Sequence, residues 1–239
     1  DADGIIQAMG VASPPTAETI IRYMRGQKLD NDPGEYYNYS NFGYMCLARI
    51  IERVTGMSYE QYVRTNVLAP MGISNMRIAN TFQHGQLPGE VTYKPTGKTI
   101  SVFPDVTPKS VPWPYGGWSL ENQDGQGSWV VSAIDYARFV AALEGRHGKA
   151  FLQSSSIAEI TKRPSARNWD DADSWYGFAL MVKPTANGQN WWHNGAMDGT
   201  VTYQIRSHDG FNWVVFLNYR PATEQLNDQI DRDIDWGLW

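Results

Sequence analysis

Apolar residues in the first third of the chain recur every three or four positions, which is the spacing of one face of an α-helix. This spacing predicts helices over 17–25 and 41–55. It also predicts a third helix that begins at Ser58 and ends before Pro70, because proline interrupts helical hydrogen bonding. In the second helix, the residues expected to share the apolar stripe are Leu47, Ile50, Ile51 and Val54.

Residues that favour helix ends stand at the borders of these segments. Thr16 is placed to cap the first helix, and Gly26 follows its end. Gly56 ends the second helix, while Ser58 and Gln61 have the spacing of a capping box. Periodicity and capping residues therefore predict the same three helices.

Residues 85–127 lose the helical periodicity. Thirteen of these 43 residues are Gly or Pro, so an irregular excursion is predicted, and loops of this length are usually functional or disordered. Helical spacing returns at 132–144, between Ser132 as the N-cap and Gly145, and a short helix is predicted at 156–161.

The last third of the chain shifts to short apolar runs and to alternation of apolar and polar residues, the period of a half-buried strand. His208-Asp209-Gly210 is a hairpin signal between two such strands. A final segment with an apolar residue at every fourth position predicts an amphipathic helix on one face of the sheet. The predicted strands are 177–183, 190–195, 200–206 and 211–219, and the final repeat is Leu226, Ile230, Ile234 and Leu238.

These elements predict an α+β architecture in a single domain over residues 1–239. A mainly helical part is expected at 16–161, with a long loop at 80–131. Three or four antiparallel strands and the closing helix are expected at 175–239.

Composition excludes several classes of function. The chain has 239 residues with 20 basic and 25 acidic side chains, a net charge of −5, which argues against broad binding of nucleic-acid phosphates. No apolar run reaches the roughly 18 residues of a transmembrane helix. A lone cysteine, Cys46, excludes an intrachain disulfide, and the four histidines show no metal-ligand spacing, so no metal and no cofactor is predicted.

The first candidate site is the triplet Tyr39-Ser40-Asn41, which a Pro33-Gly34 turn delivers to the beginning of a helix. An i, i+2 spacing in extended chain puts Tyr39 and Asn41 on one side. A phenol and an amide held together can transfer a proton and orient a carbonyl. The structural alternative is that Ser40 or Asn41 is an N-cap and Tyr39 is half-buried.

The second candidate site follows Trp191-Trp192 at the end of a predicted strand. His193 precedes Gly195, which allows a ligand or another backbone to approach closely. Backbone N–H groups at such a place could form an oxyanion hole. The alternative is a histidine whose hydrogen bonds are purely structural.

Taken together, the two sites resemble the penicillin-recognising serine hydrolases, which include class C β-lactamases, DD-peptidases and related esterases. The resemblance spans nearly the whole chain and is most specific around Tyr-Ser-Asn. The matching residues are Pro33-Gly34, Tyr39-Ser40-Asn41, Thr55-Gly56, Leu68-Ala69-Pro70-Met71-Gly72, the segment 127–143 with Ser132, Asp135 and Phe139, His193-Asn194-Gly195, Asp198-Gly199 and Leu217-Asn218.

The resemblance implies a role for each site residue. Tyr39 would transfer protons together with the family's lysine, and Asn41 would hold the amide of the substrate's acyl side chain. His193 would stand in place of the lysine of Lys-Thr-Gly, beside Gly195. The backbone N–H of Ala196 would be one oxyanion donor.

Two further aromatic residues of the long loop are candidates for substrate binding. Trp113 and Tyr115, with Trp118 nearby, could supply a stacking surface. Packing of the Pro-Trp-Pro segment within the loop is the alternative reading.

One motif of the family that this chain resembles is missing from the sequence. No serine of the chain has a lysine three residues later, so the Ser-x-x-Lys nucleophile is absent. The expectation is therefore the C-terminal two-thirds of such an enzyme, without its N-terminal strands and its serine-bearing helix. Truncation predicts exposed sheet edges and an exposed apolar face, and hence self-association as a homo-oligomer, domain swapping, or a fold rebuilt to cover the gap. The compartment is left open, with a periplasmic or secreted location expected if a signal peptide precedes the parent enzyme.

Two functions follow from the resemblance. The first is a serine hydrolase that forms an acyl-enzyme with an ester, peptide or β-lactam and is inactive as this fragment. Because a neutral imidazole is a poorer partner for an anion than an ammonium, His193 favours an esterase or peptidase over a true β-lactamase. The second is a non-catalytic pseudoenzyme or truncated product that binds a peptide or cell-wall fragment. The expected partner is a small-molecule or peptide substrate in either case.

Overall fold

A computed structural model describes residues 2–145, 148–170 and 172–220. The chain divides into two compact units. The first unit contains Asp1–Pro33, Asn38–Glu90 and Gly97–Val131. The second unit contains Gly34–Tyr37, Val91–Thr96 and Ser132–Trp239. The division predicted from the sequence, a helical part over 16–161 and strands from 175, stays a prediction.

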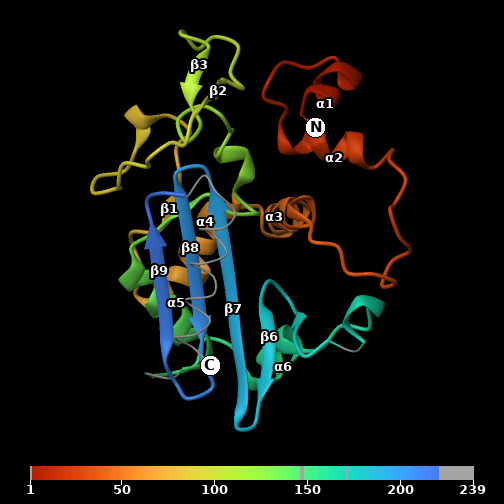
Figure 1. Cartoon of the computed structure of the whole chain (residues 1–239), viewed down its shortest axis with the longest axis vertical. Helices are drawn as coiled ribbons and strands as arrows, with labels where there is room; N and C mark the ends of the chain where they lie inside the picture. Colours follow the sequence, from red (N-terminus) through yellow and green to blue (C-terminus); the bar gives the residue numbers. More distant parts are fainter. Residues whose placement is uncertain (1, 146–147, 171, 221–239) are drawn as a thin grey trace. The chain divides into compact units, whose positions relative to one another are not determined.

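The first unit is built mainly of helices and loops, with two small antiparallel sheets of two strands each, β1–β4 and β2–β3 (Figure 1). Its elements are α1 (Ala2–Met9), α2 (Ala17–Met24), α3 (Asn41–Thr55), α4 (Tyr59–Val63), the π-helix η1 (Arg64–Leu68), the 3₁₀ helices η2 (Ala69–Met71), η3 (Gln83–Gly85) and η4 (Glu121–Gln123), and the strands β1 (Arg77–Ile78), β2 (Lys98–Ile100), β3 (Ser110–Pro112) and β4 (Trp129–Val130).

The predicted N-caps are confirmed. Thr16 accepts the backbone N–H of Thr19, and Ser58 accepts that of Gln61. Gly56 ends α3 at φ +68°, a left-handed conformation that glycine adopts without a Cβ penalty. The predicted end before Pro70 is confirmed: α4 and the π-helix η1 that follows it end at Leu68, and a separate 3₁₀ helix, η2, comes next. Pro70 occupies the first turn of a 3₁₀ helix, where its missing N–H is tolerated.

The predicted core stripe of α3 is wrong. Met45 and Ala48 are buried, while Leu47, Ile50 and Val54 are 52%, 55% and 75% exposed. The buried side of α3 faces the loop after η4.

Contacts with that loop select the buried side. A Cβ at Gly125 would lie 2.5 Å from the Cβ of Ala48, so the loop approaches the helix too closely for a large side chain. Beside this contact, Arg49 forms an ion pair with Asp124, and the Arg49 Nε lies 3.1 Å from Glu52 Oε2. The small size of Ala48 and the charge pair of Arg49 with Asp124 therefore determine which side of α3 is buried. Hydrophobic periodicity alone indicates neither of these contacts.

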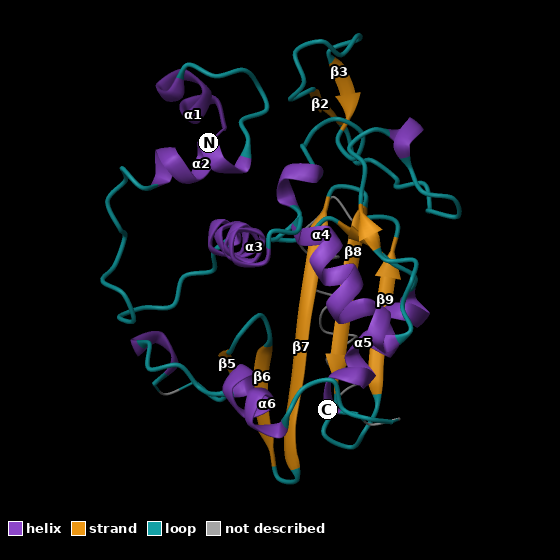
Figure 2. Ribbon diagram, turned by 180° about the vertical axis from the view of Figure 1, so that it is seen from behind, coloured by secondary structure: helices purple, strands orange, loops and turns teal. Residues whose placement is uncertain are grey.

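The second unit is organised around a five-stranded antiparallel sheet in the order β5–β6–β7–β8–β9 (Figures 1 and 2). Its elements are α5 (Ala133–Glu144), α6 (Ser154–Thr161), the 3₁₀ helix η5 (Arg167–Trp169), β5 (Trp175–Tyr176), β6 (Met181–Thr185), β7 (Gly188–Met197), β8 (Thr200–Arg206) and β9 (Asn212–Leu217).

Helices α5 and α6 lie over one face of this sheet (Figure 2). The rings of Tyr136 on α5 and Phe216 on β9 are 5.8 Å apart. Arg206 of β8 forms a two-pronged ion pair with Glu144 at the end of α5, with N···O distances of 2.7 and 3.0 Å, a geometry that fixes orientation as well as distance. The core beneath α6 consists of Trp175, Val182 and Trp191, packed by Ile157, Trp169 and Leu180.

The α+β class is confirmed, and β8 has the predicted bounds. The sheet has five strands among the described residues, where three or four were predicted. The additional strand is Trp175–Tyr176, which has too few residues to show alternation. The strand predicted at 177–183 begins only at Met181, since Gly177 to Leu180 form a tight turn. The amphipathic helix predicted at 226–238 lies outside the described residues.

The turn before β6 places a strained residue beside the sheet. Ala179 has φ +64°, a left-handed conformation that costs an L-residue about 1–2 kcal/mol. Gly177 closes the same turn, with its N–H donating to the Leu180 carbonyl at 2.8 Å. A Cβ at Gly177 would lie 2.2 Å from the Ile160 carbonyl oxygen, so position 177 requires glycine. Position 179, which has the left-handed conformation, holds alanine instead.

Replacement of Ala179 by glycine is therefore expected to stabilise the protein by about 0.5–1 kcal/mol, because relief of the left-handed strain exceeds the entropy cost of glycine. Urea unfolding measures the change. The matched control is Ala158→Gly in the interior of α6, which is expected to destabilise by about 1 kcal/mol. Equal losses in both variants would contradict the strain at Ala179.

Candidate active site

The Tyr39-Ser40-Asn41 triplet occupies the beginning of α3, where the sequence placed it. Gly34 forms the preceding turn at φ +81°. The Ser40 hydroxyl accepts the Gly43 N–H at 3.0 Å, so Ser40 is the N-cap. Because the backbone uses Ser40, the two neighbouring side chains remain as the chemical groups of the triplet. Tyr39 is 55% exposed and Asn41 is exposed as well.

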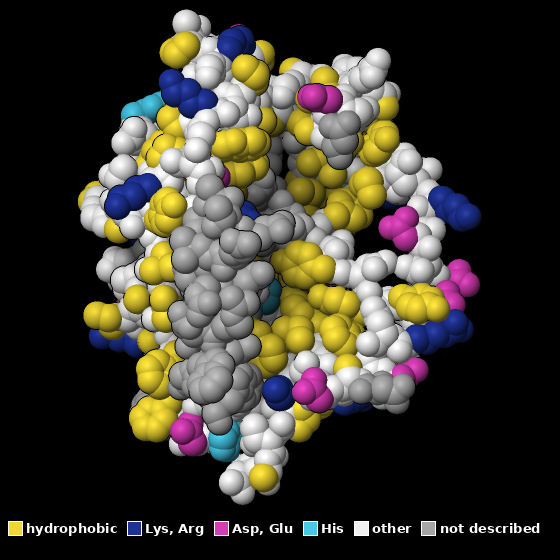
Figure 3. Space-filling model, in the orientation of Figure 1, with side chains coloured by type: hydrophobic (Ala, Val, Ile, Leu, Met, Phe, Trp, Pro, Cys, Tyr) yellow, Lys and Arg dark blue, Asp and Glu magenta, His cyan; other side chains and the backbone are white. Residues whose placement is uncertain are grey.

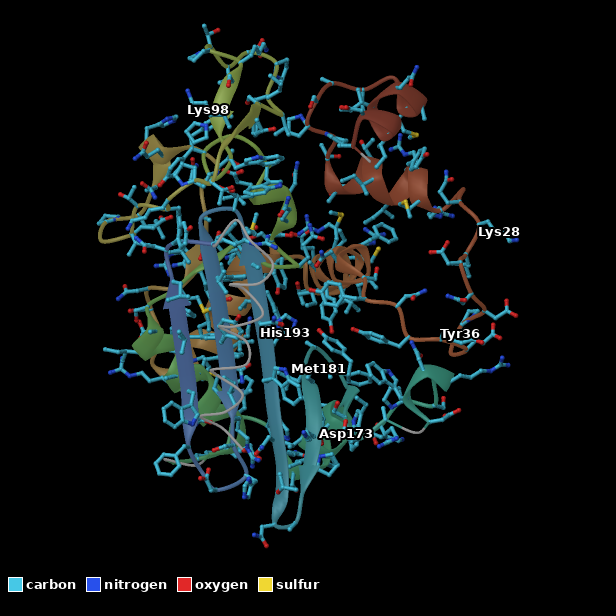
Figure 4. The ribbon with its side chains drawn as sticks, viewed as in Figure 1. Lys28, Tyr36, Lys98, Asp173, Met181 and His193 are labelled. Carbon is cyan, nitrogen blue, oxygen red and sulfur yellow. The ribbon has the colours of Figure 1, made fainter. Side chains whose placement is uncertain are left out.

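His193, Gly195 and Ala196 lie on β7, the longest strand of the sheet, and Figure 4 labels His193 there. Strand β6 pairs with β7 only as far as Trp192, which lies opposite Met181. On the other side, β8 pairs with β7 to its end at Met197. In the described part of the chain, the second half of β7 from His193 onward thus has a strand on one side only, and we call residues 193–197 the open edge.

The sheet register fixes which backbone groups point outward from the open edge. Asp198 and Gly199 form a two-residue turn, so Met197 and Thr200 are a hydrogen-bonded pair and Met197 points its N–H and C=O toward β8. Because direction alternates along a strand, Gly195 also points toward β8, and the Thr202 hydroxyl donates to its carbonyl at 3.4 Å. The N–H and C=O groups of Asn194 and Ala196 therefore point away from β8.

Gly195 is required by its cross-strand neighbour. A Cβ at this position would lie 2.9 Å from the Thr202 hydroxyl oxygen, closer than Cβ atoms approach in folded proteins.

The His193 ring contacts the side chain of Tyr176. Its Nε2 lies 3.1 Å from the hydroxyl of Tyr176 on β5, and the two rings meet edge to face at 6.1 Å between centroids. Burial lowers the pKa of His193 below its usual value, while a hydrogen bond with the Asn194 backbone acts in the opposite direction. Burial is the larger effect, so the imidazole is neutral at pH 7.

Tyr176 was missed by the sequence reasoning. It stands in a two-residue strand whose partner in space, His193, follows 17 residues later. Only the register of β5, β6 and β7 brings the pair together, and no local spacing signals it.

Trp113 and Tyr115 lie just after β3 in the first unit. The Trp113 ring packs on Trp118 at 5.1 Å, and the Tyr115 N–H donates to the Pro112 carbonyl at 2.9 Å. A Cβ at Gly117 would lie 2.7 Å from the Trp113 carbonyl oxygen. These contacts support packing within the loop, and a ligand-stacking role for Trp113 and Tyr115 stays a prediction.

The predicted site residues thus form three local groups. Tyr39 with Asn41, and Trp113 with Tyr115, belong to the first unit, whereas His193 through Ala196 belong to the second. Their roles in proton transfer, substrate binding and oxyanion stabilisation stay predictions.

The described residues hold no group of three or more His, Cys, Asp or Glu side chains suited to a metal ion. Within residues 2–145, 148–170 and 172–220, no helix combines the length and apolar character needed to cross a bilayer. On the face drawn in Figure 3, acidic and basic side chains are scattered among apolar ones rather than gathered into a basic stripe.

Comparison with known proteins identifies the family. The Beta-lactamase family matches residues 4–234, nearly the whole chain. The chain therefore belongs to the β-lactamase family, which confirms the resemblance to penicillin-recognising serine hydrolases.

Two relatives from Bacillus subtilis (strain 168) have similar sequences. Penicillin-binding protein 4* is 26% identical over 201 residues, covering 83% of this chain and 43% of the relative. The putative penicillin-binding protein PbpX is 28% identical over 233 residues, covering 95% of this chain and 51% of the relative. The chain spans about half the length of the curated relatives it matches.

Solved structures have the same fold as this chain. D-amino acid amidase from Ochrobactrum anthropi SV3 superposes with a TM-score of 0.64 at 18% identity, over 94% of this chain and 64% of that one. The octameric penicillin-binding protein homologue from Pyrococcus abyssi gives 0.62 at 22% identity, over 85% and 44%. At these identities the comparison confirms the fold.

The buried His193 ring predicts a specific pH dependence of stability. Its folded-state pKa lies below the unfolded value of about 6.5, so the unfolded state binds the proton more readily. Stability is thus expected to fall as pH drops through about 6.5 and to level off below the folded pKa. His193→Gln should flatten this slope by up to about 1.4 kcal/mol per pH unit, the limit for one proton.

Urea unfolding between pH 5 and 8 tests this dependence. The matched control is His84→Gln, which removes a histidine of the first unit and leaves His193 in place. An unchanged slope in the His193 variant would show that this ring is protonated as easily in the folded state as in the unfolded one.

Proposed function

We propose that these 239 residues carry the proton-transfer and substrate-edge parts of a serine hydrolase that cleaves an ester or amide through an acyl-enzyme. Membership of the β-lactamase family supports the reaction class. The open edge of β7 is the observation that carries the proposal, because it presents backbone groups of Asn194 and Ala196 outward from a fixed strand beside a neutral imidazole.

The open edge suits a peptide-like substrate. An extended acyl chain can add to a strand edge through main-chain hydrogen bonds, with the outward N–H and C=O groups as partners. At the carbonyl to be attacked, the Ala196 N–H would hold the oxygen as negative charge develops on it.

The remaining steps follow the family's chemistry. A serine hydroxyl adds to the carbonyl carbon, its proton passes to Tyr39 acting with a lysine, and the leaving group departs with a proton. Water then hydrolyses the acyl-enzyme. Asn41, one residue beyond the Ser40 cap, would hold the substrate's acyl amide.

A nucleophile is the part that this sequence does not provide. Because Ser-x-x-Lys is absent from the 239 residues, Tyr39 has no positioned hydroxyl to activate. The protein as it stands is therefore expected to bind without turnover, which is also the behaviour of the alternative, a non-catalytic module for peptides or cell-wall fragments.

Turnover of nitrocefin and of a p-nitrophenyl ester is expected to be indistinguishable from buffer. Tyr39→Phe is the matched variant, since it removes only a hydroxyl from an exposed side chain. Hydrolysis by the unmodified chain that disappears in Tyr39→Phe would overturn the requirement for an additional nucleophile.

Binding tests the open edge directly. Ala196→Pro deletes one outward N–H and no ladder hydrogen bond, and proline is tolerated on strand edges. A peptidoglycan stem peptide with an amidated C-terminus is expected to bind at least about tenfold more weakly to this variant. Isothermal titration calorimetry measures the affinity, and Ala196→Ser, which keeps the N–H, is the control. Equal affinity for both variants would exclude the open edge as the binding site.

Self-association through a sheet edge is kept as part of this proposal. The outer strand β9 has Trp213 48% exposed, and Phe211 immediately before it is 63% exposed. Both residues lie where apolar contact with a second copy would be expected.

A further inference from the structure

Four aromatic rings of the second unit form a continuous row that ends at the open edge. Trp169 lies 5.0 Å from Tyr37, Tyr37 lies 5.2 Å from Tyr176, and Tyr176 lies 6.1 Å from His193, measured between ring centroids. In the last contact, the Tyr176 hydroxyl also lies within hydrogen-bond distance of His193 Nε2, at 3.1 Å. We call these four residues the aromatic row.

Hydrogen bonds hold the backbone of Tyr37 and the residue before Tyr176, the two middle members of the row. Asn168 accepts the Tyr37 N–H at 2.8 Å and donates to the Tyr37 carbonyl at 2.9 Å. On β5, the Trp175 indole N–H donates to the buried carbonyl of Thr161 at 2.9 Å. Tyr176 is thus fixed by the residue before it and by the ring of Tyr37.

The contact between Tyr176 and His193 has a favoured direction. The Tyr176 hydroxyl lies 3.1 Å from His193 Nε2. A phenol O–H is a stronger hydrogen-bond donor than the N–H of a neutral imidazole, and a ring nitrogen without a proton is a stronger acceptor than a phenol oxygen. This chemistry favours Tyr176 as the donor and Nε2 as the acceptor, which leaves the ring proton on Nδ1.

We propose that Tyr176 is a positioning residue that holds His193 as a neutral imidazole with its proton on Nδ1, so that this part of the site selects acyl substrates without a carboxylate. The inference about substrates rests on the proposed function. A carboxylate is held best by a cation or by several donors, whereas a neutral ring whose Nε2 faces the Tyr176 hydroxyl offers at most one N–H. A neutral ester or amide end requires neither.

The ¹⁵N chemical shifts of the two ring nitrogens, recorded on the full chain at pH 7.5, test the state of the imidazole. His193→Gln assigns the signal. We expect a protonated Nδ1 and an unprotonated, hydrogen-bonded Nε2. In Tyr176→Phe, loss of the hydroxyl is expected to shift the tautomer ratio about five- to tenfold toward the Nε2–H form.

Tyr36→Phe is the matched control, because it removes a hydroxyl that accepts from Arg167, outside the aromatic row, while keeping the ring. The control should leave the His193 shifts unchanged. A proton on Nε2 in the unmodified chain, or identical tautomer ratios in Tyr176→Phe and the unmodified chain, would overturn the proposal.

Calorimetry with two stem peptides then tests selectivity. The amidated peptide is expected to bind at least about tenfold more tightly than the same peptide with a free carboxylate, and His193→Lys should reverse the order by supplying an ammonium. Preference for the carboxylate by the unmodified chain would overturn the selectivity. If neither peptide binds, the proposed function fails, while the ring ¹⁵N shifts still decide the role of Tyr176.

Discussion

The candidate site depends on a difference in length between two neighbouring strands. Strand β7 continues for five residues past its last pair with β6, while β8 accompanies it throughout. Backbone direction alternates along a strand, so a hairpin turn at Asp198-Gly199 determines that the groups of Asn194 and Ala196 face outward. Over residues 193–197 the other edge of β7 is paired with β8, and fixed placement is what an oxyanion donor requires.

Local sequence rules predicted the elements whose stability is local. Ser132, Ser58 and Thr16 cap helices because their hydroxyls satisfy N–H groups within the same turn. The buried side of α3 was predicted wrongly, because a close approach by Gly125 and a charge pair outweigh the apolar stripe. Two-residue strands such as β5 carry too few residues for a period to appear.

The residues of the candidate site also divide into those that a local motif predicts and those that it does not. Motif spacing predicted Tyr39, Asn41, His193 and Gly195 as site residues, each beside a turn or a strand end that a sequence can mark. Tyr176 has no such mark, since its partner is reached only through the register of three strands. Residues whose function depends on a neighbour across a sheet are thus the ones that pattern analysis misses.

The path of the chain has a consequence for how the protein can be dissected. Between residues 33 and 132 the backbone passes from one unit to the other five times, and the short stretches 34–37 and 91–96 are contributed to the second unit from within the first. Neither unit corresponds to a continuous piece of the gene. Any deletion that isolates the sheet also removes Tyr37, and with it one ring of the row that supports His193.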